Sequence, residues 1–342
     1  MKSLCILRLS AIGDVCHAVA MVQAVQKQYP ELKITWIIGK VEYQLLKHLP
    51  NIEFVIFDKS QGWKSFTKLK KDLKGQHFDL LFHMQSALRA SIASLLISAK
   101  IKLGFDRQRA SDGQWLFTNQ KIAPQPHPHV LEGFMAFAKA IGVTDLTPRW
   151  NIPVPEKDSR LAEEQILDGD QTLVICPAAS KAERNWQPER YAAIADYAIG
   201  KGFSVILCGG PSQLEKDLAE KINNESTGEL TNLVGKTSLL EMLALLKRAS
   251  IVLAPDTGPA HMAVTQGTPV IGLYAHSNPR RTGPYLYRDY VANAYPQAIS
   301  QQHSGKTAET IAWGTRAKGS ELMEMISIEQ VKAIFDKVCQ NY

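Results

Sequence analysis

Short apolar runs alternate with stretches of helical periodicity through the first half of the chain. The first run, residues 4–9, precedes apolar positions 15, 18, 19, 22 and 25, which repeat with the period of a helix that ends at Pro30. The same pattern predicts strands at 34–38, 54–57, 78–82 and 101–104 and helices at 88–97 and 130–141. Strands that alternate with helices form parallel sheets covered on both faces, so we expect an α/β domain.

The alternation breaks between residues 146 and 170 and then restarts. Prolines 148, 153 and 155, followed by charged residues, are typical of a linker and then a short helix. Beyond them the pattern predicts strands at 172–176, 203–208, 232–234, 251–254 and 270–274 and helices at 188–199, 239–249 and 328–339. A chain of 342 residues suits two domains. We expect domains at 1–155 and 156–325, a cleft between them where ligands bind, and a last helix within 326–342 that could pack back on the first domain.

The composition is that of a folded globular protein. Hydrophobic residues make up 45% and charged residues 21%, and no apolar run reaches the roughly 18 residues of a membrane span. The apolar N-terminal stretch is interrupted by Arg8 and lacks a cleavage site, which argues against a signal peptide and favours a cytoplasmic protein. The five cysteines show no metal spacing, so we expect mostly buried, reduced thiols and no metal.

Positive charge is concentrated in the first half of the chain. Residues 1–150 hold 20 lysines and arginines against 11 acidic residues, whereas the rest of the chain is slightly acidic. Such an excess fits nucleic acid, anionic lipid or a phosphorylated glycan as partner, or a solvated surface with none. Residues 59–74 combine six lysines with Trp63 and Phe66, a pattern that fits contact with an anionic membrane or lipid-linked acceptor, or the solvent face of a helix.

Residues 252–285 carry the clearest chemical signal. A buried strand leads into Asp256-Thr257-Gly258 and a helix with His261, and a second strand is followed by a loop with Arg280 and Arg281. Free N–H groups and the helix dipole favour an anion at such a helix start, and nearby arginines neutralise phosphate. The other possibilities are a core histidine and surface arginines. The arrangement predicts a diphosphate site and hence a nucleotide-binding protein.

Three further residues extend the predicted nucleotide site. Lys181 and Arg184 follow the strand that ends at residue 176 and could also neutralise a diphosphate, although each could be plain surface charge. Glu215 follows Gly209-Gly210 at the end of another strand, where an acid can accept hydrogen bonds from ribose hydroxyls. Neither a GxGxxG fingerprint nor a Walker lysine loop is present.

Gly13 and Asp14 lie at the turn between the first strand and the first helix. In an open α/β sheet this turn is at the carboxyl edge, where ligands bind. Asp14 is either a general base directed at the ligand or a carboxylate that stabilises the helix start, and the residues alone favour the second role.

Two other acidic motifs suggest different chemistry. A strand ending in Asp-Thr-Gly marks aspartic proteases too, but those are β-rich and need a paired carboxylate, so the α/β surroundings of residues 256–258 argue against one. Asp168-Gly169-Asp170 matches the metal-binding pattern of one class of glycosyltransferases, yet it lies in the linker, where Asp-Gly is an ordinary turn.

Taken together, these segments resemble the heptosyltransferases of lipopolysaccharide core synthesis, glycosyltransferase family 9. The resemblance rests on ILRLSAIGDVCHAV, GQHFDLLFHMQSALRASIAS, IKLGFDRQRA, PAASKAERNW, DTGPAHMA and NPRRTGPY, which occur in the family's order along most of the chain. It implies the GT-B fold, with two Rossmann-like domains facing a central cleft. It also implies an inverting transfer of heptose from ADP-heptose to a lipid A–Kdo acceptor at the cytoplasmic face of the inner membrane. No metal, cofactor or nucleic acid is implied, and peripheral contact with the anionic membrane is expected.

The same resemblance implies roles for individual residues. Asp14 corresponds to the family's general base, which reverses the preference for a helix cap. The residues implied in donor binding are Lys181, Arg184, Glu215, Asp256, Thr257, Gly258, His261 and Arg281. The residues implied in acceptor binding are Gly13, Lys64, Gln85 and Arg89.

Two stretches depart from the family pattern. Residues 275–279 read AHSNP where many members read GPTDP, and residues 297–320 lack a counterpart. The sequence therefore leaves open the core position and the donor sugar. Four alternatives remain: a transferase of this fold with another donor or acceptor, a GT-B-type sugar-nucleotide epimerase, a non-catalytic binder of acidic glycolipid, and an aspartic protease.

Overall fold

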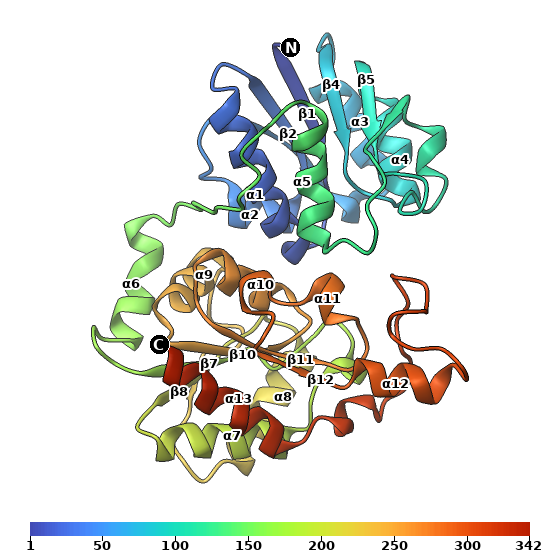
Figure 1. Ribbon diagram of the computed structural model, residues 1–342. Helices are drawn as coiled ribbons and strands as arrows, with labels where there is room; N and C mark the ends of the chain where they lie inside the picture. Colours follow the sequence, from blue (N-terminus) through green and yellow to red (C-terminus); the bar gives the residue numbers. More distant parts are fainter. The chain divides into compact units, whose positions relative to one another are not determined.

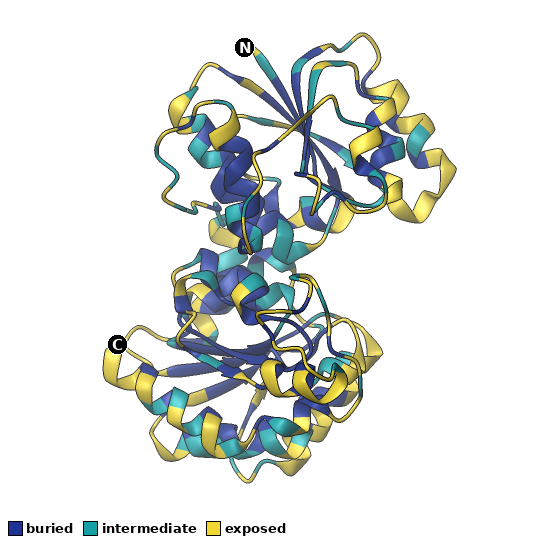
Figure 2. Cartoon of the chain, turned by 45° about the vertical axis from the view of Figure 1, so that its right-hand side comes forward, coloured by how far each residue is buried: buried dark blue, intermediate teal, exposed yellow.

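The computed structural model describes every residue from Met1 to Tyr342. It divides into two compact units, Met1–Pro153 and Val154–Tyr342, and each is described by itself. Every strand pairing in either unit is parallel. Figure 2 shows the strands mostly in the dark blue of buried residues and the outer sides of the helices largely in yellow. Both units are therefore covered parallel sheets, as the alternating pattern predicts.

The first unit is built on a sheet of six strands. They are β1 (Ser3–Leu7), β2 (Lys33–Gly39), β3 (Ile52–Phe57), β4 (Phe78–His83), β5 (Ala99–Gly104) and β6 (Gln120–Lys121). Their order is β3-β2-β1-β4-β5-β6, with Leu7 of β1 between Ile37 and His83. The direction of winding reverses between β1 and β4, and ligands bind beyond the carboxyl ends of strands at such a switch point.

Helices cover both faces of this sheet (Figure 1). They are α1 (Ile12–Gln28), α2 (Lys40–Leu46), α3 (Trp63–Asp72), α4 (Leu88–Leu95) and α5 (Val130–Ala140). Leu69 of α3 and Ala93 of α4 share one apolar cluster with Leu7, so both helices lie on the same face. Helices α1 and α5 pack together, and Phe137 of α5 contacts Phe82, which places them on the opposite face. The outer sides of α3 and α4 consequently point away from the sheet in the same direction.

The second unit repeats this topology. Its strands are β7 (Thr172–Ile175), β8 (Ser204–Leu207), β9 (Thr231–Asn232), β10 (Ile251–Pro255), β11 (Val270–Tyr274) and β12 (Val291–Asn293). Its strand order is β12-β11-β10-β7-β8-β9. When β7 is counted as its first strand, this order, read from β9 to β12, is the same as that of the first sheet. The switch point accordingly lies between β7 and β10.

The helices of the second unit form two groups around its sheet (Figure 1). They are α6 (Glu156–Gln165), α7 (Pro188–Gly200), α8 (Gln213–Glu225), α9 (Leu239–Arg248), α10 (Gly258–Thr265), α11 (Pro279–Thr282), α12 (Tyr295–Gln302) and α13 (Ile328–Asn341). Helix α9 packs on α6 and α10, and α7 packs on α8 and α13. The C-terminal helix α13 also contacts β11 and β12. Its packing partners α7, β11 and β12 all belong to the second unit.

Other expectations can be compared with the structure directly. Residues 168–170 form a turn in which the Asp170 N–H donates to the Leu167 carbonyl at 3.1 Å, so the turn is confirmed. All five cysteines are free thiols and four of them are buried. No helix combines the length and apolar character needed to cross a membrane.

Candidate active site

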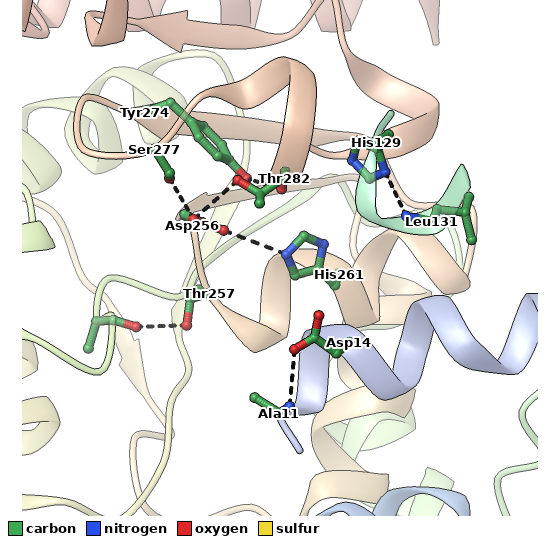
Figure 3. A network of polar contacts seen from close by, with 11 residues as sticks. Ala11, Asp14, His129, Leu131, Asp256, Thr257, His261, Tyr274, Ser277 and Thr282 are labelled. Atoms are coloured by element: carbon green, nitrogen blue, oxygen red, sulfur yellow. Dashed lines mark hydrogen bonds and ion pairs between the residues drawn. The ribbon is translucent and has the colours of Figure 1, made fainter. Parts of the chain in front are cut away.

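In the first unit, the carboxylate of Asp14 lies at the switch point. Asp14 is the third residue of α1, and its Oδ2 accepts the backbone N–H of the N-cap residue Ala11 at 3.2 Å (Figure 3). A carboxylate in the first turn also meets the positive end of the helix dipole. Asp14 therefore does stabilise the helix start, which is the role that the residues alone favour.

Arg8 is the partner that orients Asp14. It follows β1 and is buried, and its guanidinium pairs with Asp14 Oδ2, donates to the Met84 carbonyl at 2.6 Å and lies 5.2 Å from the Phe134 ring centre. Both contacts to Asp14 use Oδ2, and the Asp14 side chain is 33% exposed. Its Oδ1 takes part in neither contact, so the cap and the base are compatible roles for one carboxylate.

Gln85 joins the two loops at the switch point of the first unit. Its Oε1 accepts the Leu9 N–H at 2.7 Å, and its Nε2 donates to Ser10 Oγ at 3.3 Å. Gln85 follows β4, whereas Leu9 and Ser10 follow β1. The amide therefore fixes the backbone that leads to Gly13, and these contacts make it a positioning residue.

Lys64 and Arg89 occupy equivalent places on two neighbouring helices. Lys64 lies in the first turn of α3 and Arg89 in the first turn of α4, and both are exposed. Because these helices follow β3 and β4, their first turns lie at the carboxyl edge of the sheet, the edge that also carries Asp14.

In the second unit, Asp256 is the centre of a polar network (Figure 3). Its Oδ2 accepts from Ser277 Oγ at 2.5 Å and Thr282 Oγ1 at 3.3 Å, and its Oδ1 lies 3.7 Å from His261 Nε2. Burial alone would raise the pKa of Asp256, but the hydrogen bonds from His261 and Ser277 and the charges of His261 and Arg316 outweigh it and lower the pKa. Both carboxylate oxygens are engaged, so Asp256 connects the loop after β10 to the loop after β11.

The N-terminus of α10 is available to an anion. Thr257 is its N-cap, but the hydroxyl donates to the Ala178 carbonyl at 3.2 Å and makes no capping bond. Pro259 has no N–H, so the backbone donors of the first turn belong to Gly258, Ala260 and His261. The helix start for which the sequence predicts an anion site therefore has backbone donors and no side-chain cap, and the hydroxyl of Thr257 fixes its turn.

Cations lie on the loops that follow β7 and β11. Arg184 ends a 3₁₀ turn, and burial followed by the nearby charge of Arg316 lowers its pKa. Arg281 lies on α11 and is half-buried, whereas Lys181 is exposed and lies 3.8 Å from Glu183. These loops lie at the carboxyl edge of the sheet, the edge that also carries the start of α10.

Glu215 lies beside the glycine turn after β8. A Cβ built at Gly210 would lie 2.5 Å from Glu215 Oε2, so a larger residue there would displace this carboxylate from its position. The N–H of Glu215 is capped by Ser212 Oγ at 3.3 Å, and burial raises the pKa of its carboxyl. The side chain is thus held at a strand end, as a ribose-binding acid would be.

With this geometry in place, comparisons with known proteins identify the family. The family model for glycosyltransferase family 9 (heptosyltransferase) matches residues 66–336. The chain belongs to glycosyltransferase family 9. The sequence resemblance is thereby confirmed, and so is the prediction that the chain is a glycosyltransferase.

Relatives of this family 9 chain include enzymes of lipopolysaccharide core synthesis. The lipopolysaccharide core heptosyltransferase OpsX of Haemophilus influenzae is 47% identical over 330 residues, which are 96% of this chain and 95% of that protein. The lipopolysaccharide heptosyltransferase 3 of Escherichia coli is 24% identical, over 77% of this chain and 80% of that one.

Solved structures of other family members have the same fold. The family 9 glycosyltransferase of Veillonella parvula superposes with a TM-score of 0.81 at 21% identity, covering 100% of this chain and 98% of that one. The E. coli heptosyltransferase WaaC with ADP gives a TM-score of 0.75 at 18% identity, covering 99% and 100%. The GT-B fold is therefore confirmed, and the aspartic protease alternative is excluded because its fold is β-rich.

Several residues around the two switch points were not predicted from the sequence as parts of a site. Arg8 was noted only as an interruption of an apolar stretch, although a charged residue directly after a buried strand is itself a sign of a site. Ser277 and Thr282 gave no signal, because their role depends on a contact with Asp256 from another loop.

Proposed function

We propose that this chain transfers heptose from ADP-heptose to the inner-core, lipid A–Kdo region of lipopolysaccharide, with inversion at the anomeric carbon. The observation that carries the proposal is the contrast between the switch points. One presents a carboxylate oxygen of Asp14 that contacts neither Arg8 nor Ala11, and the other presents an anion site at α10 with Arg184 and Arg281 nearby. The 47% identity to a lipopolysaccharide core heptosyltransferase supports the choice of sugar and acceptor.

In the proposed step, Asp14 Oδ1 accepts the proton of an acceptor hydroxyl. The hydroxyl oxygen forms a bond to the anomeric carbon of the donor while the bond from that carbon to the diphosphate oxygen breaks. The electron pair of the broken bond leaves on ADP. Arg8 and the N–H of Ala11 hold Oδ2, which keeps Oδ1 directed at the substrate throughout.

The charge that develops on ADP is stabilised by groups of the second unit. The N–H donors of α10 and its dipole favour the phosphate, and Lys181, Arg184 and Arg281 supply positive charge. We propose that these groups perform the stabilisation without a metal or cofactor. Transfer rates measured with and without a chelator test this directly, and an unchanged rate is expected.

The decisive test replaces Asp14 by asparagine. Asp14→Asn keeps the size and a hydrogen-bond acceptor but cannot take the proton, so transfer should fall at least about a hundredfold. Binding of ADP, measured by calorimetry, should stay unchanged because the donor residues are intact. Asp217→Asn, at an exposed carboxylate of α8 that contacts only Gln213, is the matched control and should retain full transfer.

The assay also separates the proposal from its alternatives. ADP-heptose is incubated with the protein and truncated core acceptors, and products are identified by mass. A heptose adduct on a core acceptor is expected. Near-normal turnover by Asp14→Asn would overturn the assignment of the base. Conversion of the donor without any acceptor would instead indicate an epimerase, and binding of acidic glycolipid without ADP affinity would indicate a non-catalytic binder.

We further propose that the first unit contacts the anionic cytoplasmic face of the inner membrane, where the lipid-linked acceptor lies. The first turns of α3 and α4 each expose an apolar residue beside a cation, namely Trp63 with Lys64 and Leu88 with Arg89. Trp63 is 76% and Leu88 57% exposed. Cations are unfavourable at helix N-termini, so their presence at both suggests that they serve an anionic ligand.

Vesicle co-sedimentation tests the membrane contact. Wild-type protein should bind vesicles rich in phosphatidylglycerol and not vesicles of phosphatidylcholine alone. The double variant Trp63→Ala, Leu88→Ala should lose binding while it retains transfer to a soluble truncated acceptor. Leu167→Ala, which removes a 63% exposed leucine of the second unit, is the control. Equal binding by the double variant would contradict this surface.

A further inference from the structure

Residues 303–320 form an ordered segment that departs from the family pattern. The segment lies between α12 and the 3₁₀ turn Leu322–Met325, and Ala308, Ile311 and Ala317 within it are buried. The Arg280 guanidinium lies 5.8 Å from the ring centre of Trp313. The segment is therefore packed against the second unit near the loop that carries Arg281.

The backbone on both sides of Arg316 is held by hydrogen bonds. The Thr315 carbonyl accepts from the Tyr295 hydroxyl at 2.9 Å, and the Ala317 N–H donates to the His276 carbonyl at 2.9 Å. The Lys318 N–H donates to Gln302 Oε1 at 2.9 Å, and the Gln302 amide donates to the Lys318 carbonyl. These hydrogen bonds on both sides of Arg316 fix the position of its backbone. The conformational entropy that this ordering costs is therefore already lost before a ligand binds.

His276 connects this segment to the donor loops. Its Nδ1 lies 3.1 Å from the Ala317 carbonyl oxygen, and its Nε2 lies 2.8 Å from the carbonyl oxygen of Glu183, the residue before Arg184. The next residue, Ser277, donates to Asp256. His276 and Ser277 belong to the other stretch that departs from the family pattern, so the two departures are in direct contact beside Asp256 and Arg184.

The charge of Arg316 acts at the donor site. Arg316 is exposed, and it helps to lower the pKa of both Arg184 and Asp256. Because the charge of Arg316 lowers the pKa of Arg184, the two guanidinium groups repel each other in the free protein. An anion bound near both would reverse this repulsion, and a diphosphate carries the charge and the oxygen acceptors that arginine binds well.

We propose that Arg316 is a donor-binding residue which contacts the diphosphate of the nucleotide sugar, and that the contact between His276 and Ala317 holds it in place. The inference rests on the proposed function and deepens it. The 303–320 segment is then a part of the donor site which this chain has in place of the usual family sequence. Arg316 adds to the positive charge that the N-terminus of α10, Lys181, Arg184 and Arg281 supply in the proposed function.

Calorimetry with three ligands tests the inference without any transfer assay. ADP, AMP and adenosine are titrated into the wild-type protein and into Arg316→Ala, Arg316→Lys and Lys318→Ala. Arg316→Ala should weaken ADP binding about tenfold, AMP less and adenosine not at all, because only the phosphates meet the guanidinium. Arg316→Lys should recover part of the loss. Lys318→Ala, which removes an exposed cation two residues away, should match the wild type.

Each result has one interpretation. Unchanged ADP affinity in Arg316→Ala would overturn the inference and leave the proposed function standing. Equal weakening of ADP and adenosine would also overturn it, because that result indicates a structural role. Wild-type protein that does not bind ADP would overturn the proposed function together with the inference. Thermal unfolding of each variant, expected within a degree or so of wild type for an exposed side chain, confirms that the fold is intact.

Discussion

The two units share one strand order, yet their switch points carry opposite chemistry. In the first unit the turn after β1 presents a carboxylate, and a single buried guanidinium, that of Arg8, accompanies it. In the second unit the turn after β10 begins a helix with no side-chain cap, and the loops after β7 and β11 carry Arg184 and Arg281. Strand order thus determines where a ligand is expected to bind, whereas the residues in the turns determine the chemistry, which is proton transfer in one unit and phosphate binding in the other under the proposed function.

The two aspartates illustrate the difference. Asp14 lies inside the first turn of its helix and uses one oxygen for both structural contacts, and the other oxygen takes part in neither. Asp256 precedes the N-cap of its helix, and both of its oxygens have partners within the protein. The same residue type beside a switch point therefore connects two loops in the second unit, whereas in the first unit it is the general base that we propose.

The largest expected effect on stability comes from Asp256. Asp256→Asn removes the charge that holds Ser277, Thr282 and His261, and should destabilise the second unit by about 3 kcal/mol. Urea unfolding with and without ADP measures this, and ADP affinity should fall as well. Asp168→Asn removes an ion pair at a 96% exposed carboxylate and should change stability by under about 1 kcal/mol. If both variants unfolded alike, Asp256 would not be a connector.

The pH dependence of the same variant gives a second comparison. Because the pKa of Asp256 is lowered in the folded state, the charged carboxylate stabilises the fold fully at pH values above the range where free aspartates titrate. That contribution is lost as the pH falls through the folded-state value. Wild-type protein should therefore lose more stability than Asp256→Asn on acidification, and parallel curves would contradict the network.

The next effect, on transfer rather than stability, comes from Arg8. Arg8→Met should lower kcat about thirtyfold, because Asp14 loses the partner that directs Oδ1, while ADP affinity stays unchanged. Arg8→Lys keeps a charge near Asp14 and should recover part of the rate. Steady-state transfer to a soluble acceptor measures both. Loss of ADP binding in Arg8→Met would indicate damage beyond the first switch point.

Most of the fold could be predicted because buried parallel strands are continuous apolar runs. Residues 172–176, 251–254 and 270–274 were predicted as strands and correspond to β7, β10 and β11 almost residue for residue. Helices α2 and α8 were missed. The first is only seven residues long, and the second is largely polar with few buried positions, so neither has a clear apolar period.

The site was predictable only where its residues are close in sequence. The turn at 256–258 and the helix start at Asp14 each combine a strand end with a helix start within a few residues, so the pattern indicates them. Arg316 is 60 residues from Asp256 in the chain, and its place depends on His276 and on a fold that periodicity does not specify. Contacts of this kind need three-dimensional structure.

The smallest expected effect, on ADP binding, comes from Glu215, the acid that we propose binds a neutral ribose hydroxyl. Glu215 is held beside Gly210, and its burial fits a ribose hydroxyl better than a cation as partner. Glu215→Gln should weaken ADP binding about tenfold. Of the two analogues 2′-deoxy-ADP and 3′-deoxy-ADP, the one that lacks the hydroxyl which Glu215 contacts should lose much less affinity, because that hydrogen bond is already absent. Glu220→Gln, at an exposed acid of the same helix, is the control. Equal losses for ADP and both analogues would mean that Glu215 stabilises the turn and contacts no ribose hydroxyl.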